Sequence, residues 1–322
     1  MWTIVRKELA DHFSSTRFLI LFCLIIMAAL ITSYMVGAQI REALEGARAG
    51  REAFLLIFTS SYHFLSVVNF IAFFGPLLGI IMGFDAINKE KNAGTLSKLL
   101  AQPIWRDAVI NGKFIAGVIT IALVLASLLL LVSGLGLLTV GVVPGGSEVL
   151  RLLIYYLISV LYVSFWMGLA MLFSVVFRLV ATSALASVAL WIFFAFFIGI
   201  VSTVVANAVR PVKNPADPNQ HLANAETREV VQLISPAVLF SKATEAIVDP
   251  YRRAASENIA YGRVAVRGGR MEYLSMERFK NPLPVSQSLA IVLPYILLLV
   301  GITAICFTLS YIIFMKQEIR AA

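Results

Sequence analysis

The chain has 322 residues, 60% of them hydrophobic, and a formal net charge of +8 at pH 7. Soluble domains are about 45–50% apolar, so this composition excludes an ordinary soluble fold. In a soluble protein the positive charge would suggest nucleic-acid binding. In a membrane protein it fits basic residues that flank spans and face anionic lipid, so we expect no nucleic-acid partner.

Long apolar runs follow one another along the chain, and they hold Asp, Glu, Lys or Arg only at their very ends. A helix needs about 20 apolar residues to cross the hydrocarbon core, whereas spanning strands would alternate. The predicted fold class is therefore an all-α polytopic membrane protein. Six transmembrane helices are expected near residues 18–36, 64–84, 114–143, 152–177, 179–208 and 289–315.

The distribution of basic residues predicts the orientation. With the N-terminus inside, the inner segments hold eleven Lys and Arg residues and the short outer loops hold four, which favours cytoplasmic N- and C-termini in the inner membrane. We expect no removable signal peptide. The predicted parts are a cytoplasmic helix at 1–17, helices one to five at 18–209, an extracytoplasmic subdomain at 210–287, and the last helix with its tail at 288–322.

The first predicted helix is amphipathic. Trp2, Val5, Leu9 and Phe13 recur at steps of three and four residues and so share one helix face. We expect this helix to lie on the inner membrane surface before the chain enters its first span.

Local signals refine the membrane part. Gly75-Pro76 predicts a kink in the second span, and residues 39–60 predict a short charged outer helix. Arg151 is assigned to a short outer loop. Near Arg178 the chain either forms a tight hairpin between spans four and five or breaks one long run.

The outer segment carries clear start and stop signals. Ser235-Pro236 predicts a helix with Ser235 as its cap and Pro236 at its first position. A short helix is expected at 224–234, and a hairpin turning at Gly268-Gly269. Helix is not expected at three earlier prolines, Pro211, Pro215 and Pro218.

The motifs of several enzyme classes are absent from the sequence. It has no G-x-x-x-x-G-K-[ST] nucleotide loop, and its three histidines lie far apart with no metal-ligand spacing. We therefore expect no catalytic residues, no metal site and no enzyme activity of its own. Ion-driven carriers usually place acids or bases in the membrane. Without them, uphill transport would need energy from a partner.

The segment between spans two and three, residues 85–113, carries the most information. We expect the second span to continue as a charged helix through about Lys91 and to break at Gly94. Thr95 would then cap a short leucine-bearing helix that ends at Pro103. The result is an amphipathic protrusion at the inner surface. Its charges would pair with one another or with a docked protein, unless it is a helix on the lipid surface.

This ordered set of residues resembles the first cytoplasmic loop of ABC-2 type transporter permeases, in the NosY-like and gliding-motility branch. The matching residues are Asp85, Glu90, Gly94, Thr95, Leu96, Leu99, Leu100, Pro103, Arg106, Gly112 and Lys113. The N-terminal run is similar to the family's elbow helix, at Arg6, Lys7, Glu8 and Leu9. Ser235-Pro236 resembles the family's outer-loop motif.

The resemblance implies a permease subunit that pairs with a second permease chain, identical or not. Each permease would dock on a separate cytoplasmic ATPase subunit, two per complex, which binds ATP and Mg²⁺; this chain would bind no cofactor. The loop at 85–113 would act as the coupling helix, and spans one, two and five would tilt around a path at the dimer interface. The segment 210–287 is long for such a permease, so the substrate does not carry over.

Two other functions are weighed. In one, the chain is a non-transporting anchor or mechanotransmitter that relays ATPase motion to an extracytoplasmic partner through 210–287. In the other, it is an ion-coupled carrier that works alone, which the lack of intramembrane charge argues against. If the protein transports, its neutral spans favour a hydrophobic or amphipathic substrate.

Overall fold

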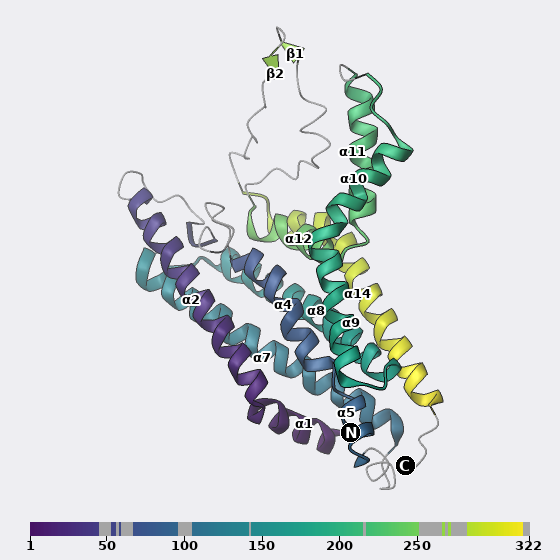
Figure 1. The fold of residues 1–322 in the computed structure, drawn as a ribbon. Coiled ribbons are helices and arrows are strands. Elements are labelled where there is room, and N and C mark those ends of the chain that lie inside the picture. The colour runs from purple at the N-terminus through teal and green to yellow at the C-terminus, as the bar shows by residue number, and fades with distance from the viewer. Residues whose placement is uncertain are drawn as a thin grey trace. The chain divides into compact units, whose positions relative to one another are not determined.

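A computed structural model describes residues 1–44, 53–55, 58, 67–95, 105–141, 143–214, 217–250, 266–267, 270–271 and 282–317. Its regular structure is helical apart from one short strand pair (Figure 1). The chain divides into two units. Unit 1 is Met1–Trp191 with Leu297–Ala322, and unit 2 is Ile192–Ile296.

Six helical stretches within the described residues are long and apolar enough to cross a membrane, which confirms the predicted number and order of spans. On which side of the membrane the ends lie stays a prediction. The stretches are Thr16–Met35, Val67–Asn92, Arg106–Thr139, Gly146–Val176, Val180–Val209 and Val285–Lys316.

Unit 1 begins with α1 (Trp2–Ser14) and α2 (Thr16–Leu44), which both pack against α7 (Arg106–Val140). After a 3₁₀ turn at Ala53–Leu55 comes α4 (Val67–Gly83) and then α5 (Asn88–Asn92). The second half contains α8 (Gly146–Val176) and α9 (Val180–Ile192). The break between α8 and α9 shows two separate helices near Arg178. The predicted outer helix at 39–60 lies largely outside the described residues, although α2 extends to Leu44.

The closest helix pair in unit 1 is α4 against α8, because three glycines line the α4 side. A Cβ on Gly75 would lie 2.9 Å from Val163 Cγ2, and a Cβ on Gly79 or Gly83 would overlap a backbone oxygen of α8. Small residues four apart let two membrane helices approach to backbone contact. The spacing of these glycines is visible in the sequence, but the partner helix is not.

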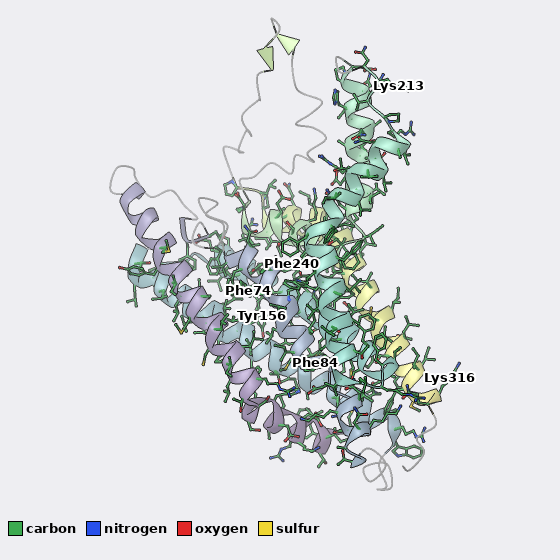
Figure 2. All side chains as sticks on the ribbon, viewed as in Figure 1. Phe74, Phe84, Tyr156, Lys213, Phe240 and Lys316 are labelled. Carbon is green, nitrogen blue, oxygen red and sulfur yellow. The ribbon has the colours of Figure 1, made fainter. Side chains whose placement is uncertain are left out.

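A tyrosine compensates for the proline inside α4. Pro76 has no N–H, so the carbonyl of Ala72 loses its helical donor. Tyr162 Oη on α8 donates to that carbonyl at 2.8 Å. In a bilayer no water is at hand to replace the bond, so Tyr162 holds α4 together at the proline. Tyr156 of α8 (labelled in Figure 2) donates to Ala122 O on α7 at 3.0 Å.

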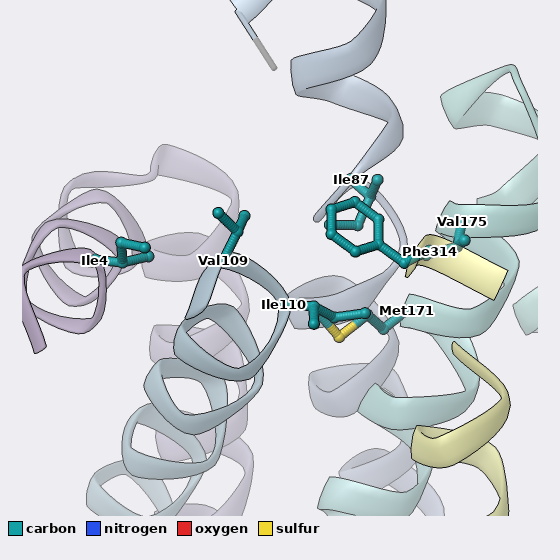
Figure 3. Packing of buried hydrophobic residues seen from close by; sticks show 7 residues of the cluster. All are labelled: Ile4, Ile87, Val109, Ile110, Met171, Val175 and Phe314. Atoms are coloured by element: carbon teal, nitrogen blue, oxygen red, sulfur yellow. The ribbon is translucent and has the colours of Figure 1, made fainter. Parts of the chain in front are cut away.

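One apolar cluster joins the ends of five segments of unit 1. It is formed by side chains from α1, from the turn before α5, from α7, from α8 and from the end of α14 (Figure 3). The buried members are Ile4, Ile87, Val109, Ile110, Met171, Val175 and Phe314. Because Ile87, Val109 and Ile110 of this cluster belong to residues 85–113, the cluster fixes the base of that segment.

Unit 2 continues the fifth span as a π-helix at Phe193–Phe197 and α10 (Ile198–Val209). Then α11 (Pro218–Gln232) and α12 (Pro236–Val248) follow, bent by 109° relative to each other. The strands β1 (Val266–Arg267) and β2 (Arg270–Met271) pair antiparallel, in agreement with the predicted hairpin. The unit ends in α14 (Val285–Lys316), whose second half belongs to unit 1.

Two sequence predictions about helix starts are wrong. Pro218 is the first residue of α11, where a missing N–H costs nothing, and Asp217 Oδ1 caps the helix by accepting from Asn219 N at 3.0 Å. Arg151 lies inside α8 and is 1% exposed. The helix begins earlier than predicted because Gly145 caps it and donates its N–H to Glu148 Oε2 at 2.7 Å.

We expect Gly79→Ala to lower the stability of the protein by about 1–3 kcal/mol, because the added methyl group meets the α8 backbone and forces the helices apart. Thermal melting in detergent measures the effect. Gly134→Ala on α7 is the matched control, since a Cβ there has no neighbour within 4 Å. Equal melting temperatures for the two variants would contradict the packing described for α4 and α8.

Candidate functional site

The segment predicted to couple to a partner begins with a turn. α4 ends at Gly83, and residues 84–87 form a turn before α5. Ser174 Oγ on α8 accepts from Ile87 N at 3.0 Å and from Asn88 N at 3.1 Å. The second span does continue as one helical stretch to Asn92, close to the predicted end near Lys91, but a turn at 84–87 interrupts it. The hydroxyl of Ser174 thus accepts two successive backbone N–H groups that would donate to carbonyls of the same helix if the helix were continuous.

The predicted break at Gly94 is confirmed. Gly94 has φ of +66°, a left-handed conformation that favours glycine. Thr95 Oγ1 donates to Glu90 O at 3.2 Å, so its hydroxyl hydrogen-bonds a backbone carbonyl of α5. Four further residues predicted for coupling lie outside the described residues, namely Leu96, Leu99, Leu100 and Pro103.

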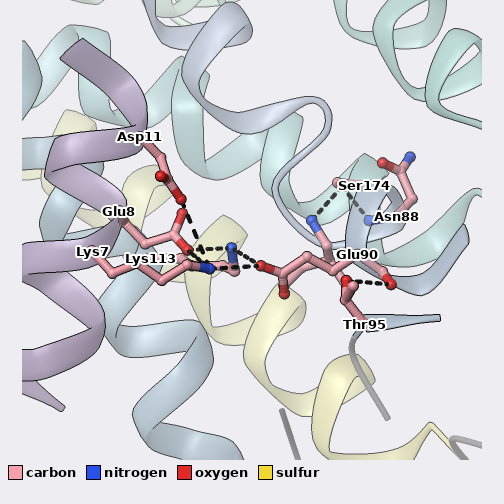
Figure 4. Close-up of polar contacts among 9 residues, drawn as sticks. Lys7, Glu8, Asp11, Asn88, Glu90, Thr95, Lys113 and Ser174 are labelled. Carbon is pink, nitrogen blue, oxygen red and sulfur yellow. Dashed lines mark hydrogen bonds and ion pairs between the residues drawn. The ribbon is translucent and has the colours of Figure 1, made fainter. Parts of the chain in front are cut away.

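A buried lysine joins three helices (Figure 4). Lys113 Nζ on α7 lies 2.8 Å from Glu8 Oε1 on α1 and 2.9 Å from Glu90 Oε1 on α5. Only 6% of the Lys113 side chain is exposed. A buried charge needs close partners because its desolvation is costly, so Lys113 holds α1 and α5 against the start of α7.

Weaker ion pairs surround this triad. Lys7 Nζ lies 3.8 Å from Glu8 and Asp11 and 3.9 Å from Glu90. The sequence left open whether the charges of 85–113 pair with one another or with a docked protein. In the structure Lys113 pairs with Glu90 of the same segment and with Glu8 of α1.

A second link joins the same segment to α2. Arg17 Nη1 lies 3.6 Å from Asp85 Oδ2. Asp85, like Glu90 and Lys113, therefore contacts the protein's own helices, and the role of these residues in coupling stays a prediction.

Arg106, at the start of α7, is tied to the end of α14. Its Nη1 donates to Gln317 O at 3.2 Å, and Gln317 Nε2 donates to Val175 O on α8 at 2.7 Å. The predicted coupling residue Arg106 thus links three helices of unit 1.

The elbow residues divide between the interior and the surface. Arg6 and Lys7 are exposed, Leu9 is half-buried and Glu8 is buried. Of the predicted apolar face, Val5 is buried, whereas Trp2 is 63% exposed and Phe13 44% exposed. That this helix lies on the membrane surface stays a prediction.

Most of the exposed residues in the described part of the segment are polar. Lys89, Lys91, Asn92, Gly94 and Thr95 are exposed, and Trp105 just before α7 is 83% exposed. These residues form a surface that a partner can reach. We call them the α5 surface.

The outer-loop motif is a helix start, as predicted. Pro236 is the first residue of α12 and Ser235 precedes it as the cap, but no bond from the Ser235 side chain caps the helix. No group of three or more metal-ligating side chains occurs among the described residues.

The comparisons with known proteins now identify the family. A family model described as ABC-2 family transporter protein matches residues 2–319. The chain belongs to the ABC-2 transporter family. It is thus a permease of the ABC transporter family, as predicted, and membership implies a membrane setting.

Two curated relatives support the NosY-like branch. The chain is 31% identical over 123 residues to "probable ABC transporter permease protein NosY" of Pseudomonas aeruginosa, which covers 38% of this chain and 40% of that protein. It is 28% identical over 148 residues to the protein of the same name from Stutzerimonas stutzeri, which covers 46% and 48%. The chain thus matches less than half the length of either relative.

We expect Lys113→Met to destabilise the protein by about 3 kcal/mol, because Glu8 and Glu90 then lose their close cation and keep only Lys7, at 3.8 and 3.9 Å. Thermal melting of the purified chain measures this. The triple variant Glu8→Gln, Glu90→Gln, Lys113→Met should recover part of the loss. Lys89→Met is the control, since Lys89 is exposed and has no ion pair among the described residues. If the control loses as much stability, the triad is not a clamp.

His12 gives a prediction about pH. Its Nδ1 lies 3.2 Å from Thr120 Oγ1, and burial lowers the pKa of His12 below its ordinary 6.5, outweighing the attraction of Glu8. Below about pH 6.5 the unfolded chain binds this proton more readily than the folded one, so the stability of the protein decreases as the pH falls. His12→Gln should make the melting temperature less dependent on pH below about 6.5. A variant as acid-sensitive as the wild type would contradict this.

Proposed function

We propose that this permease subunit docks on its cytoplasmic ATPase through the α5 surface and transmits ATP-driven movement into the bundle. ATP and Mg²⁺ would bind on that partner, and two permease chains and two ATPase subunits would form the complex. The observation that carries the proposal is the linkage of one exposed segment to two helices: to α1 through Lys113, and to α8 through Ser174.

The linkage is short and polar at each step. Glu90 and Lys113 are 2.9 Å apart, and Ser174 accepts two backbone N–H groups from the start of α5 at 3.0 and 3.1 Å. Asn92 Nδ2 at the end of α5 also donates to Arg178 O at 3.1 Å. A force on α5 therefore acts on α1, α7 and the break between α8 and α9 without first deforming the apolar interior.

A buried amide supports movement of this segment. Asn88 is fully buried, yet neither Oδ1 nor Nδ2 has a hydrogen-bond partner in the described part of the chain. Such a group costs free energy in this conformation. If α5 shifted so that the Asn88 amide gained a hydrogen-bond partner, the new bond would offset part of the free-energy cost of the shift.

We infer that a transported substrate enters from the bilayer. Ionisable side chains lie near the ends of the spans, so a small inorganic ion would find few ligands midway. A hydrophobic or amphipathic molecule fits neutral walls better.

The test measures how much the tagged chain raises the ATP hydrolysis rate of the ATPase subunit that co-purifies with it in mild detergent. We expect Lys89→Glu with Lys91→Glu to reduce that increase at least about tenfold, because these charges lie at the rim of the interface and guide docking. The melting temperature of the double variant should stay unchanged. Lys213→Glu, exposed in unit 2, is the control. Unchanged stimulation in the double variant would overturn docking through the α5 surface.

Glu90→Lys serves as a different comparison. It should lower both stimulation and melting temperature, because Glu90 belongs to the buried triad. A Glu90→Lys protein with normal melting would show that the triad does not support the segment.

A further inference from the structure

A charged cavity of about 560 Å³ opens where α1, the end of α4, α5 and the start of α7 meet. Its lining includes as many basic as acidic side chains, so its formal charge is zero although both signs are concentrated there. The basic residues are Lys7, Arg17, Lys89 and Lys113, and the acidic ones are Glu8, Asp11, Asp85 and Glu90.

Three of the basic side chains keep free hydrogen-bonding capacity. Among the described residues, Lys7 and Arg17 meet acids only at 3.6–3.9 Å, beyond a normal hydrogen bond. Their side chains are 55% and 70% exposed. Lys89 is exposed as well. Lys113, in contrast, is engaged by Glu8 and Glu90. The rim can therefore offer N–H donors from three cations to a phosphate.

Acceptors are also left over in the same cavity. The Asp11 side chain is 60% exposed. Glu90 uses Oε1 for Lys113, while its Oε2 is buried without a hydrogen-bond partner among the described residues. A primary ammonium group would supply the donor that this oxygen lacks. The cavity thus complements a ligand that carries both a phosphate and an amine.

The position of the cavity favours a lipid as the source of that ligand. It lies where the apolar stretch of α2 begins and where α4 ends, and Ile81, Met82 and Phe84 contribute apolar lining. From this point α2 presents a stripe of exposed apolar side chains at helical spacing. The stripe is formed by Ile20, Leu24, Met27 and Ile31. Acyl chains lying along it would hold the headgroup at the cavity.

We propose that this cavity binds the headgroup of an aminophospholipid with a primary amine. The phosphate lies against Lys7, Arg17 and Lys89, and the ammonium against Asp11 and Glu90. A choline headgroup lacks N–H donors for these acids, and a glycerol headgroup lacks the positive charge. Binding here does not require an ATPase to dock, although Lys89 also belongs to the α5 surface, and the test therefore uses variants of Lys7, Arg17 and Asp11, which lie outside that surface.

The test is native mass spectrometry of the full chain, delipidated in detergent and titrated separately with phosphatidylethanolamine, phosphatidylcholine and phosphatidylglycerol. We expect the ethanolamine lipid to bind most tightly. Lys7→Gln with Arg17→Gln should weaken it by about fivefold per cation removed. Asp11→Asn should abolish the preference over the other two lipids. Arg210→Gln with Lys213→Gln, on exposed residues of unit 2, is the control and should bind as the wild type does.

Several results would overturn the proposal. Equal binding of all three lipids would show that the amine is not recognised. Unchanged binding in the Lys7/Arg17 variant would place the lipid elsewhere. Competition by soluble phosphoethanolamine at concentrations similar to the lipid's would identify a free headgroup, not a lipid, as the ligand. Melting temperatures of all variants are measured in parallel, and because the substituted side chains are exposed they should stay within a degree or two of the wild type.

Discussion

The ammonium group of Lys113 is the constraint on which the base of the bundle depends. A lysine with 6% of its side chain exposed must keep its acidic partners close, and those partners come from α1 and α5. Glu8 therefore points into the protein, which leaves Trp2 and Phe13 on the outside of α1. The charge on α7 and the buried side chains of Ile4 and Val5 together hold the N-terminal helix in this orientation.

The helix α8 provides the second fixed point. Its backbone packs against the glycines of α4, and its Tyr162 donates to the carbonyl that has no helical donor because of Pro76. Its Ser174 accepts two N–H groups in the turn that follows α4. All three contacts lie along one helix pair. α4 and the turn before α5 therefore move together with α8, and α5 is held between that pair on one side and α1 on the other.

What the sequence could predict depended on local chemistry. The spans follow from hydropathy, the break at Gly94 from the backbone freedom of glycine, and the start of α12 from Pro236, because each signal lies within one continuous segment of the chain. The turn at 84–87 and the burial of Arg151 were not predicted. They depend on which side chains of distant helices meet, such as Ser174 with Ile87, and no spacing within one segment reveals that.

The contacts between the helices differ between the middle of the spans and their base. Between the span ends, the helices contact each other mainly through apolar side chains and glycines, with single hydrogen bonds such as those of Tyr156 and Tyr162. At the base, hydrogen bonds and ion pairs of 2.8–3.1 Å connect α5 to α1, α7 and α8. Directional contacts of this kind break or shift as units, whereas apolar contacts slide. Under the proposed docking, a push on α5 would reach α1 and α7 through the Lys113 triad and α8 through the Ser174 bonds.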